Sequence, residues 1–235
     1  MRETQTRPGL GFGLLGWLIA LLFPGAIFLL WAIVAASGGR QIIPDPGTAF
    51  ARLGVLLGQP GVQKALLATL TSWSAAFVLG ATLGLVVGIP AGRTRIGGAL
   101  LSPLALVVAT LPAALLALMF VLYDGIDGPS GYFVPGAIAA FLPAAAVSAR
   151  AQAGDTAERW RGAFHALEAA SVAALTAVVF AEMLAGKDRL GTMAITAFSM
   201  FDAPTMYALV VLLWLLGLAA ALPFALGRWL AGRAV

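Results

Sequence analysis

Long apolar runs separated by short polar segments dominate this chain and predict helices that cross a membrane. A helix needs about 20 apolar residues to span the hydrocarbon core of a bilayer. The pattern predicts about six spans, at residues 14–36, 65–89, 98–122, 132–147, 163–185 and 205–226. Strand-like alternation of polar and apolar residues is absent from these runs. The expected fold class is therefore an all-α membrane protein.

The composition supports this class and excludes several others. The 235 residues are 61% hydrophobic and only 10% charged, whereas soluble domains carry about 25% charged residues. This balance excludes an ordinary soluble enzyme and a disordered tail. The net charge of +4 comes from scattered residues and not from a basic stripe, so no nucleic-acid partner is expected. With no cysteine and one histidine, we expect no disulfide, no thiolate chemistry and no metal site.

The first apolar run has two interpretations. Ala35-Ala36-Ser37-Gly38 resembles a cleavage site, which is typical of a secretory signal peptide. The run is longer than the 7–15 apolar residues that are usual in such peptides. We therefore favour a retained first helix.

The polar segments predict a single transmembrane domain over residues 1–235. Its extra-membrane parts would be a cytoplasmic N-terminus at 1–13, an external loop at 37–63, a cytoplasmic loop at 148–161 and a cytoplasmic C-terminus at 227–235. Within the external loop, Asp45-Pro46-Gly47-Thr48 predicts the start of a short interfacial helix. Positive residues favour the cytoplasmic side of membrane proteins. Most of the 14 Lys and Arg residues lie in the segments assigned to the inside: Arg2, Arg7, Arg93, Arg95, Arg150, Arg159, Arg161, Arg228 and Arg233.

Four glycines in the second predicted span recur at every fourth position, at Gly80, Gly84, Gly88 and Gly92. On a helix they form a ridge without side chains, which lets another backbone approach closely. The ridge predicts a packing face. The sequence leaves open whether this face packs inside the bundle, against another subunit, or against a helix that slides during transport.

Glu168 and Glu182 are the carboxylates that fall inside apolar spans. A charged group in a membrane span is costly and suggests function unless a partner neutralises it. About four helical turns separate the two, so both lie near one face of their helix. For Glu168 the alternative is an interfacial pairing with His165 or Arg161. Glu182 lies near the outer end of its span, where a hydrated carboxylate is the alternative to a functional one.

Motifs for chemistry are absent from the sequence. It contains no phosphate-binding loop that ends in Gly-Lys-Ser/Thr, no His-Glu-x-x-His and no Gly-x-Ser-x-Gly. We expect neither a catalytic residue nor a bound cofactor in this chain. If nucleotide hydrolysis drives its activity, another chain must bind ATP and magnesium.

Three segments of the chain, in order, match the motifs of one known family. They are Ile43-Pro44-Asp45-Pro46, then Ala68-Thr69-Leu70 followed by the glycine ridge, then Ala181-Glu182-Met183 followed by Leu190-Gly191. They resemble the Leu-Pro-x-Pro start, the second segment and the Ala-Glu-Met … Gly-Leu-Gly segment of the permease subunits of bacterial ATP-binding-cassette importers of the nitrate/sulfonate/taurine type. The resemblance implies the fold of a type I importer permease.

The chain departs from that family at two places. An arginine that follows Thr-Leu in the family is Ser72 here. The cytoplasmic motif that docks onto the ATPase is missing, and the chain is shorter than the family between Pro112 and Glu182. Glu168-Ala169-Ala170 matches only the first letters of that motif, and neither its glycine nor its Leu-Pro follows. We interpret this match as a coincidence.

The resemblance implies a permease subunit of the bacterial inner membrane that imports a small polar or anionic solute. Its partners would be a second permease chain, cytoplasmic ATPases and an external solute-binding protein, all within membrane lipid. A different second permease is favoured over an identical one, because two copies of this chain would lack the standard docking motif. Candidate pathway or gate residues are Glu182, Met183, Thr110 and Met119, with the loop 187–198 near the outer gate. Candidate ATPase-docking residues are Arg150, Arg159 and Arg161.

Two other functions stay open at this point. An accessory membrane subunit would keep the permease fold without ATPase coupling. An intramembrane enzyme is less favoured, because the sequence shows no catalytic pair.

Overall fold

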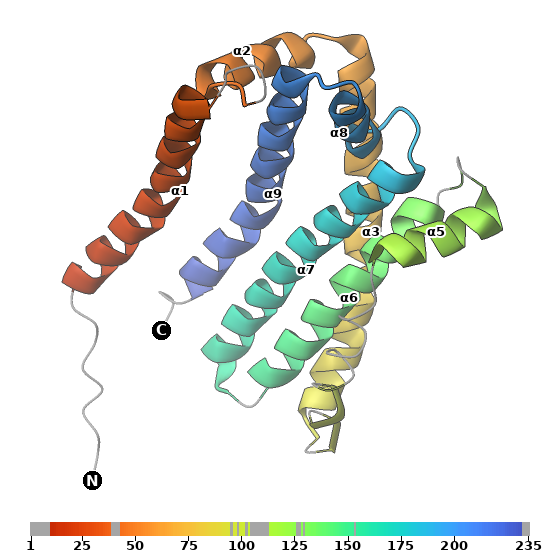
Figure 1. Ribbon diagram of the computed structural model, residues 1–235. Helices are drawn as coiled ribbons and strands as arrows, with labels where there is room; N and C mark the ends of the chain where they lie inside the picture. Colours follow the sequence, from red (N-terminus) through yellow and green to blue (C-terminus); the bar gives the residue numbers. More distant parts are fainter. Residues whose placement is uncertain are drawn as a thin grey trace.

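The computed structural model describes residues 10–38, 43–94, 96–97, 99–101, 103, 113–125, 128, 130–152 and 154–231, and these form an all-helical assembly without strands (Figure 1). The principal helices are α1 (Leu10–Gly38), α2 (Pro46–Leu57), α3 (Pro60–Gly92), α5 (Ala113–Asp124), α6 (Ser130–Ala151), α7 (Thr156–Ala185), α8 (Leu190–Ser199) and α9 (Ala203–Ala231). The expected fold class, an all-α membrane protein, is confirmed.

Four of the described helices are long and apolar enough to cross a membrane. They are Pro60–Gly92, Gly131–Ala151, Thr156–Ala185 and Ala203–Ala231, which correspond to the second, fourth, fifth and sixth expected spans. The first expected span lies within α1. The third overlaps residues 104–112, which lie outside the described part of the chain.

Loops and short helices gather at the two ends of the long helices. In Figure 1, α2, α8 and the α7–α8 connection lie at one end, and the α6–α7 turn lies at the other with the end of α9. Most of the segment expected as a cytoplasmic loop at 148–161 is helical: α6 continues to Ala151, α7 begins at Thr156, and residues 152–155 connect them. Its cytoplasmic location stays a prediction. Asp155 caps α7 by accepting a hydrogen bond from the backbone N–H of Glu158 at 2.8 Å. This cap shortens the connection to a tight turn.

The short helix expected after Asp45 is present as α2. The carboxylate of Asp45 accepts hydrogen bonds from the backbone N–H of Thr48 at 3.0 Å and from its hydroxyl at 2.7 Å. These bonds lower the pKa of Asp45 below its ordinary value. Pro46 then occupies the first helical turn, where a missing N–H costs nothing. The local sequence is therefore sufficient to start this helix.

The glycine ridge packs inside the bundle, against α6. A Cβ atom added at Gly80 would lie 2.7 Å from the Cβ of Ala140, and one added at Gly84 would lie 2.5 Å from the Cβ of Ala144. A Cβ at Gly92 would lie 2.6 Å from the Cα of Ala149. A Cβ at Gly88 would likewise meet the backbone of α6, at Ala145. The bare ridge therefore lets α3 and α6 approach closely, as small residues do between membrane helices.

Buried polar groups tie α7 to its neighbours α3 and α9. The hydroxyl of Ser171 donates to the carbonyl of Ala220 at 2.9 Å, while the indole N–H of Trp73 donates to the carbonyl of Ser171 at 3.0 Å. A polar group in an apolar interior costs free energy unless it is hydrogen-bonded. These bonds therefore help to fix the position of α7 in the centre of the assembly.

Candidate functional site

The carboxylate of Glu182 is fully buried between α3, α7 and α8. Its exposed fraction is 0%, so the hydrated position considered from the sequence is wrong. Its Oε2 atom accepts a hydrogen bond from the hydroxyl of Thr69 on α3 at 2.9 Å and one from the backbone N–H of Gly191 on α8 at 3.3 Å. Glu182 thus joins three helices through one carboxylate.

Glu182 and Thr69 together cap the start of α8. The Arg189 side chain makes no capping bond there, although Arg189 occupies the N-cap position. The hydroxyl of Thr69 accepts a hydrogen bond from the backbone N–H of Leu190 at 3.2 Å, and the carboxylate of Glu182 accepts one from the backbone N–H of Gly191. The first N–H groups of a helix carry partial positive charge and favour a nearby anion. Helix α8 is therefore held in place by side chains from two other helices.

Arg189 neutralises the buried carboxylate. Its Nη1 atom lies 3.3 Å from Oε1 of Glu182, and it also donates to the Ser72 hydroxyl at 2.7 Å and the Ala68 carbonyl at 3.1 Å. The guanidinium stacks over the ring of Tyr132, with 4.1 Å between its central carbon and the ring centroid. Burial of the pair is tolerable because both partners are also hydrogen-bonded.

Replacing Thr69 with valine is expected to lower the free energy of unfolding by about 1–3 kcal/mol. The change leaves the Leu190 N–H without its acceptor and removes one donor from Glu182, and buried groups without partners cost about that much. Thr71→Val is the matched control on the same helix, because Thr71 is exposed and its hydroxyl donates to the carbonyl of Leu67 in the same helix. Thermal and denaturant unfolding of the detergent-solubilised protein measures the stability of both variants. Equal losses in the two variants would contradict a structural role specific to Thr69.

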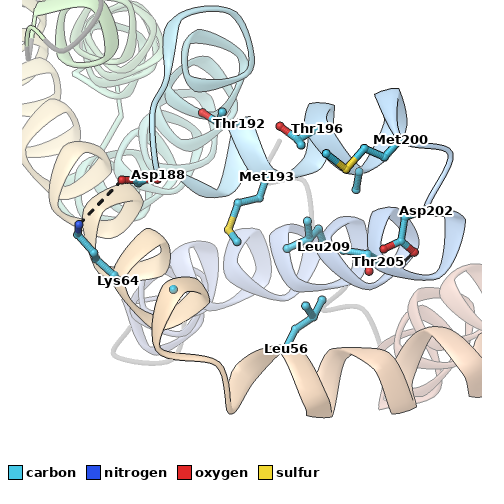
Figure 2. Close-up of a pocket in the computed structure, with 12 residues that line it drawn as sticks. Leu56, Lys64, Asp188, Thr192, Met193, Thr196, Met200, Asp202, Thr205 and Leu209 are labelled. Carbon is cyan, nitrogen blue, oxygen red and sulfur yellow. Dashed lines mark hydrogen bonds and ion pairs between the residues drawn. The ribbon is translucent and has the colours of Figure 1, made fainter.

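An open pocket of about 470 Å³ lies beside α8, between α2, α3 and α9 (Figure 2). Its walls are formed by Leu56, Gly61, Lys64, Asp188, Thr192, Met193, Thr196, Ala197, Met200, Asp202, Thr205 and Leu209. Figure 2 shows Lys64 and Asp188 at one end, Asp202 and Thr205 at the other, and Leu56 and Leu209 between them. We call this cavity the α8 pocket.

The α8 pocket and the buried carboxylate share one helix. Thr192 lines the pocket and donates its hydroxyl hydrogen to the backbone carbonyl of Glu182 at 2.9 Å. Asp188 before α8 and Phe201 after it both have positive φ values, 52° and 56°, a conformation that non-glycine residues adopt rarely. The position of α8, and with it the pocket wall, thus depends on the Glu182 site and on two unusual turns.

Each end of the α8 pocket carries a loose ion pair. Lys64 Nζ and Asp188 Oδ2 are 4.0 Å apart, and both side chains are largely exposed. At the other end, Arg52 Nη2 lies 3.8 Å from Asp202 Oδ2, while Arg52 Nε donates to the Thr205 hydroxyl at 2.8 Å. Hydrogen bonding from Thr205 holds the pKa of Asp202 below its ordinary value, and the Arg52 charge acts in the same direction. Asp202 is therefore an anion at neutral pH.

The other predicted pathway residues do not join this site. Met183 faces an apolar groove between α7 and α9, next to Trp214. Met119 lies on α5 with 66% of its surface exposed. Thr110 lies outside the described residues. The pathway roles of Met183 and Met119 stay predictions.

Glu168 belongs to a separate cluster near the middle of α7, about four helical turns before Glu182. Its Oε2 atom lies 3.2 Å from Nη1 of Arg228 on α9 and 3.7 Å from Nδ1 of His165. The expected pairing with His165 is thus observed, with Arg228 and not Arg161 as the arginine partner. Glu168-Ala169-Ala170 lies inside helix α7 and not in the α6–α7 connection. This position agrees with its interpretation as a coincidental match to the docking motif.

The three candidate docking arginines lie around the α6–α7 turn. Arg150 is in the last turn of α6, and Arg159 and Arg161 are in the first two turns of α7. All three are exposed. Arg159 Nε donates to the carbonyl of Gly154 at 3.1 Å, which braces the turn.

The long apolar helices define a polytopic α-helical membrane protein. No family model matches the chain. Over 130 residues, 54% of its length, it is 28% identical to a curated Bacillus subtilis (strain 168) protein described as a putative aliphatic sulfonates transport permease protein, SsuC. The match spans about half of that relative (47%). It supports the resemblance to importer permeases of the sulfonate type and a multi-pass location in the inner membrane.

Sequence reasoning identified Glu182 but missed Arg189 and Thr192, which contact it, and Tyr132, over whose ring Arg189 stacks. One signal for Arg189 was present. Ser72 replaces an arginine of the family that the chain resembles, and a carboxylate inside a span needs a cation from elsewhere. Arg189 follows Glu182 closely in the sequence, and its Nη1 reaches the Ser72 hydroxyl.

Proposed function

We propose that this chain is a permease subunit of an ATP-driven importer of the inner membrane and forms part of the pathway for a small polar or anionic solute. The observation that carries the proposal is α8, a short helix seated beside an open pocket at the end opposite the α6–α7 turn. The match to a transport permease favours the same class. In this proposal, α8 and its pocket form the outer end of the pathway.

The proposed partners follow from this class. Cytoplasmic ATPases with bound ATP and magnesium would supply the energy, an external binding protein would deliver the solute, and a second permease would complete the pathway. Both chain ends would face the cytoplasm with the α6–α7 turn. A different second permease is favoured, because the connection at 152–155 is too short to contain a docking helix.

The test is purification of the tagged chain from its native membrane in a mild detergent. Recovery of an ATPase and a second permease supports the importer. If the chain is stable and recovered alone, the importer function is rejected. That outcome favours the second candidate, an accessory subunit without ATPase coupling, and the tight α6–α7 turn is the observation behind it.

Charge reversal at the α6–α7 turn tests ATPase docking. In the double variant Arg159→Glu, Arg161→Glu, we expect a loss of co-purified ATPase of about tenfold or more. Both positions are exposed, and the new glutamates would repel an ATPase surface that attracts the arginines. Lys187→Glu is the control, since Lys187 is an exposed cation in the α7–α8 connection, at the opposite end. Unchanged recovery in the double variant would show that this turn does not dock the ATPase.

A further inference from the structure

A groove of about 500 Å³ lies between the first turns of α7 and the last turns of α9. Its walls are formed by uncharged residues: Thr156, Ala157, Trp160, Phe164, Gly227, Leu230 and Ala231. The Phe164 ring lies against Gly227, where an added Cβ would be 2.5 Å from its Cε1 atom, so the two helices approach closely at this point. We call this cavity the α7–α9 groove. Its lining favours an apolar ligand.

The groove lies where α7 and α9 leave the hydrocarbon core of a membrane. The two helices contain 30 and 29 residues, so each is about 45 Å long at about 1.5 Å per residue. The hydrocarbon core is about 30 Å thick, and the bilayer with its headgroups is about 40–45 Å thick. The first turns of α7 and the last turns of α9 therefore reach the lipid headgroups. Trp160 and Trp229 are partly exposed there, as is common for tryptophan at a membrane interface.

One flank of the groove carries a cation that no protein group neutralises. Arg161 comes four residues after Ala157 and three before Phe164, and residues at these spacings are neighbours on a helix surface. Both neighbours line the groove. Arg161 is exposed, and among the described residues it has neither an ion pair nor a hydrogen bond. The indole N–H of Trp160, whose side chain is 62% exposed, also has no acceptor in the described part of the chain.

The acidic residues of this region are engaged or face elsewhere. Asp155 caps α7, and Glu168 pairs with Arg228. Glu158 precedes Trp160 by two residues, which correspond to about 200° of rotation, so it lies on the opposite side of the helix. The flank beside the groove therefore presents positive charge, which is complementary to an anionic lipid headgroup.

We propose that the α7–α9 groove binds one phospholipid with an anionic headgroup. The phosphate pairs with Arg161 and accepts a hydrogen bond from the Trp160 indole, and one acyl chain lies along Leu230 and Ala231. A soluble anion would gain nothing from the apolar walls, whereas a lipid uses the charge and the walls together. This proposal goes beyond the proposed function and does not rest on it, because it requires only that the chain lies in a membrane.

The test is native mass spectrometry of the purified full chain in detergent. The chain is titrated with phosphatidylglycerol or with phosphatidylcholine that carries the same acyl chains. We expect the first phosphatidylglycerol to bind about fivefold more tightly, which is the contribution of one arginine near a membrane surface. Inorganic phosphate at millimolar concentration is expected not to displace it. Equal binding of the two lipids, or displacement by phosphate, overturns the proposal.

A charge variant locates the headgroup. Arg161→Gln is expected to abolish the preference of about fivefold for phosphatidylglycerol. Arg93→Gln is the matched control and is expected to keep this preference. Arg93 is an exposed cation that ends α3 at the same end of the bundle, where Gly92 packs against Ala149 of α6, and it does not line the groove. A preference that survives Arg161→Gln, or that is lost in the control, overturns the proposal.

A packing variant locates the acyl chain. Ala231→Phe places a ring in the groove and is expected to weaken phosphatidylglycerol binding about tenfold, the equivalent of roughly two methylenes that are no longer buried. Ala219→Phe is the control, because Ala219 is exposed on the same helix and does not line the groove. Equal binding by the two variants would place the lipid elsewhere and refute the site.

Lipid binding and co-purification test the two proposals separately. Arg161 also belongs to the proposed docking surface, so lipid binding is measured without an ATPase. A chain that prefers phosphatidylglycerol but is recovered alone from its membrane keeps the lipid site and refutes the importer. A chain that recovers an ATPase but binds both lipids equally refutes only the lipid site.

Discussion

Replacing Glu182 with alanine is expected to lower the free energy of unfolding by about 3–5 kcal/mol, the typical cost of removing one partner of a buried ion pair. The guanidinium of Arg189 would keep its buried position, 19% exposed, without an anion. The start of α8 would lose the carboxylate that accepts from Gly191. Denaturant unfolding of the detergent-solubilised protein measures the loss.

Two further variants test whether the unpaired charge of Arg189 causes this loss of stability. Glu158→Gln is the control for loss of a carboxylate on α7, because Glu158 is exposed near the α6–α7 turn; its effect is expected to be within about 0.5 kcal/mol. The double variant Glu182→Leu, Arg189→Met removes both charges. It is expected to cost less than the sum of its single changes, since neither charge is left unpaired. Additive costs would contradict a direct interaction between Glu182 and Arg189.

Adding a methyl group to the glycine ridge is expected to be the other strongly destabilising change. Alanine at Gly84 would place its Cβ 2.5 Å from the Cβ of Ala144 and 3.0 Å from the backbone nitrogen of Ala145. A backbone atom cannot rotate away, so α3 and α6 must separate. Overpacking of this kind costs about 1–3 kcal/mol, and the melting temperature of the solubilised protein would fall accordingly.

Gly217→Ala on α9 is the matched control for the ridge. A Cβ at Gly217 meets nothing within 4 Å, and alanine is favoured over glycine in a helix by about 0.5–1 kcal/mol. The control is therefore expected to be neutral or slightly stabilising. A neutral result for Gly84→Ala would mean that the α3–α6 contact is looser than the structure shows.

The sequence predicted the long helices because their signals are local, but the expected loop at 187–198 is wrong, since most of it forms α8 (Leu190–Ser199). Apolar length set the spans, Asp45 and Pro46 marked the start of α2, and four-residue glycine spacing marked a packing face. The helical structure of most of the expected loop at 148–161 also has a local reason. The polar residues of 156–161 indicate exposure to water, but an exposed segment that is capped by Asp155 can still be helical.

The sequence identified only part of the candidate site. Glu182 stood out because a carboxylate in an apolar run is unusual. The sequence did not show that Glu182 and Thr69 cap α8. Thr69 is distant from α8 in the sequence, and the backbone N–H groups that it and Glu182 bind, at Leu190 and Gly191, occur in every residue except proline. The α8 pocket likewise draws on α2, α3, α8 and α9, which no single motif connects.

The sequence by itself thus determined that this protein is a helical membrane protein, because hydrophobic length and periodicity are properties of neighbouring residues. It also identified the glycine ridge and the unusual carboxylate. Only the tertiary structure decided that the ridge packs against α6, that Arg189 neutralises Glu182 and that α8 borders a pocket with charge at both ends. These features depend on which distant segments meet, and that choice follows from burying all the apolar faces and satisfying the buried polar groups together.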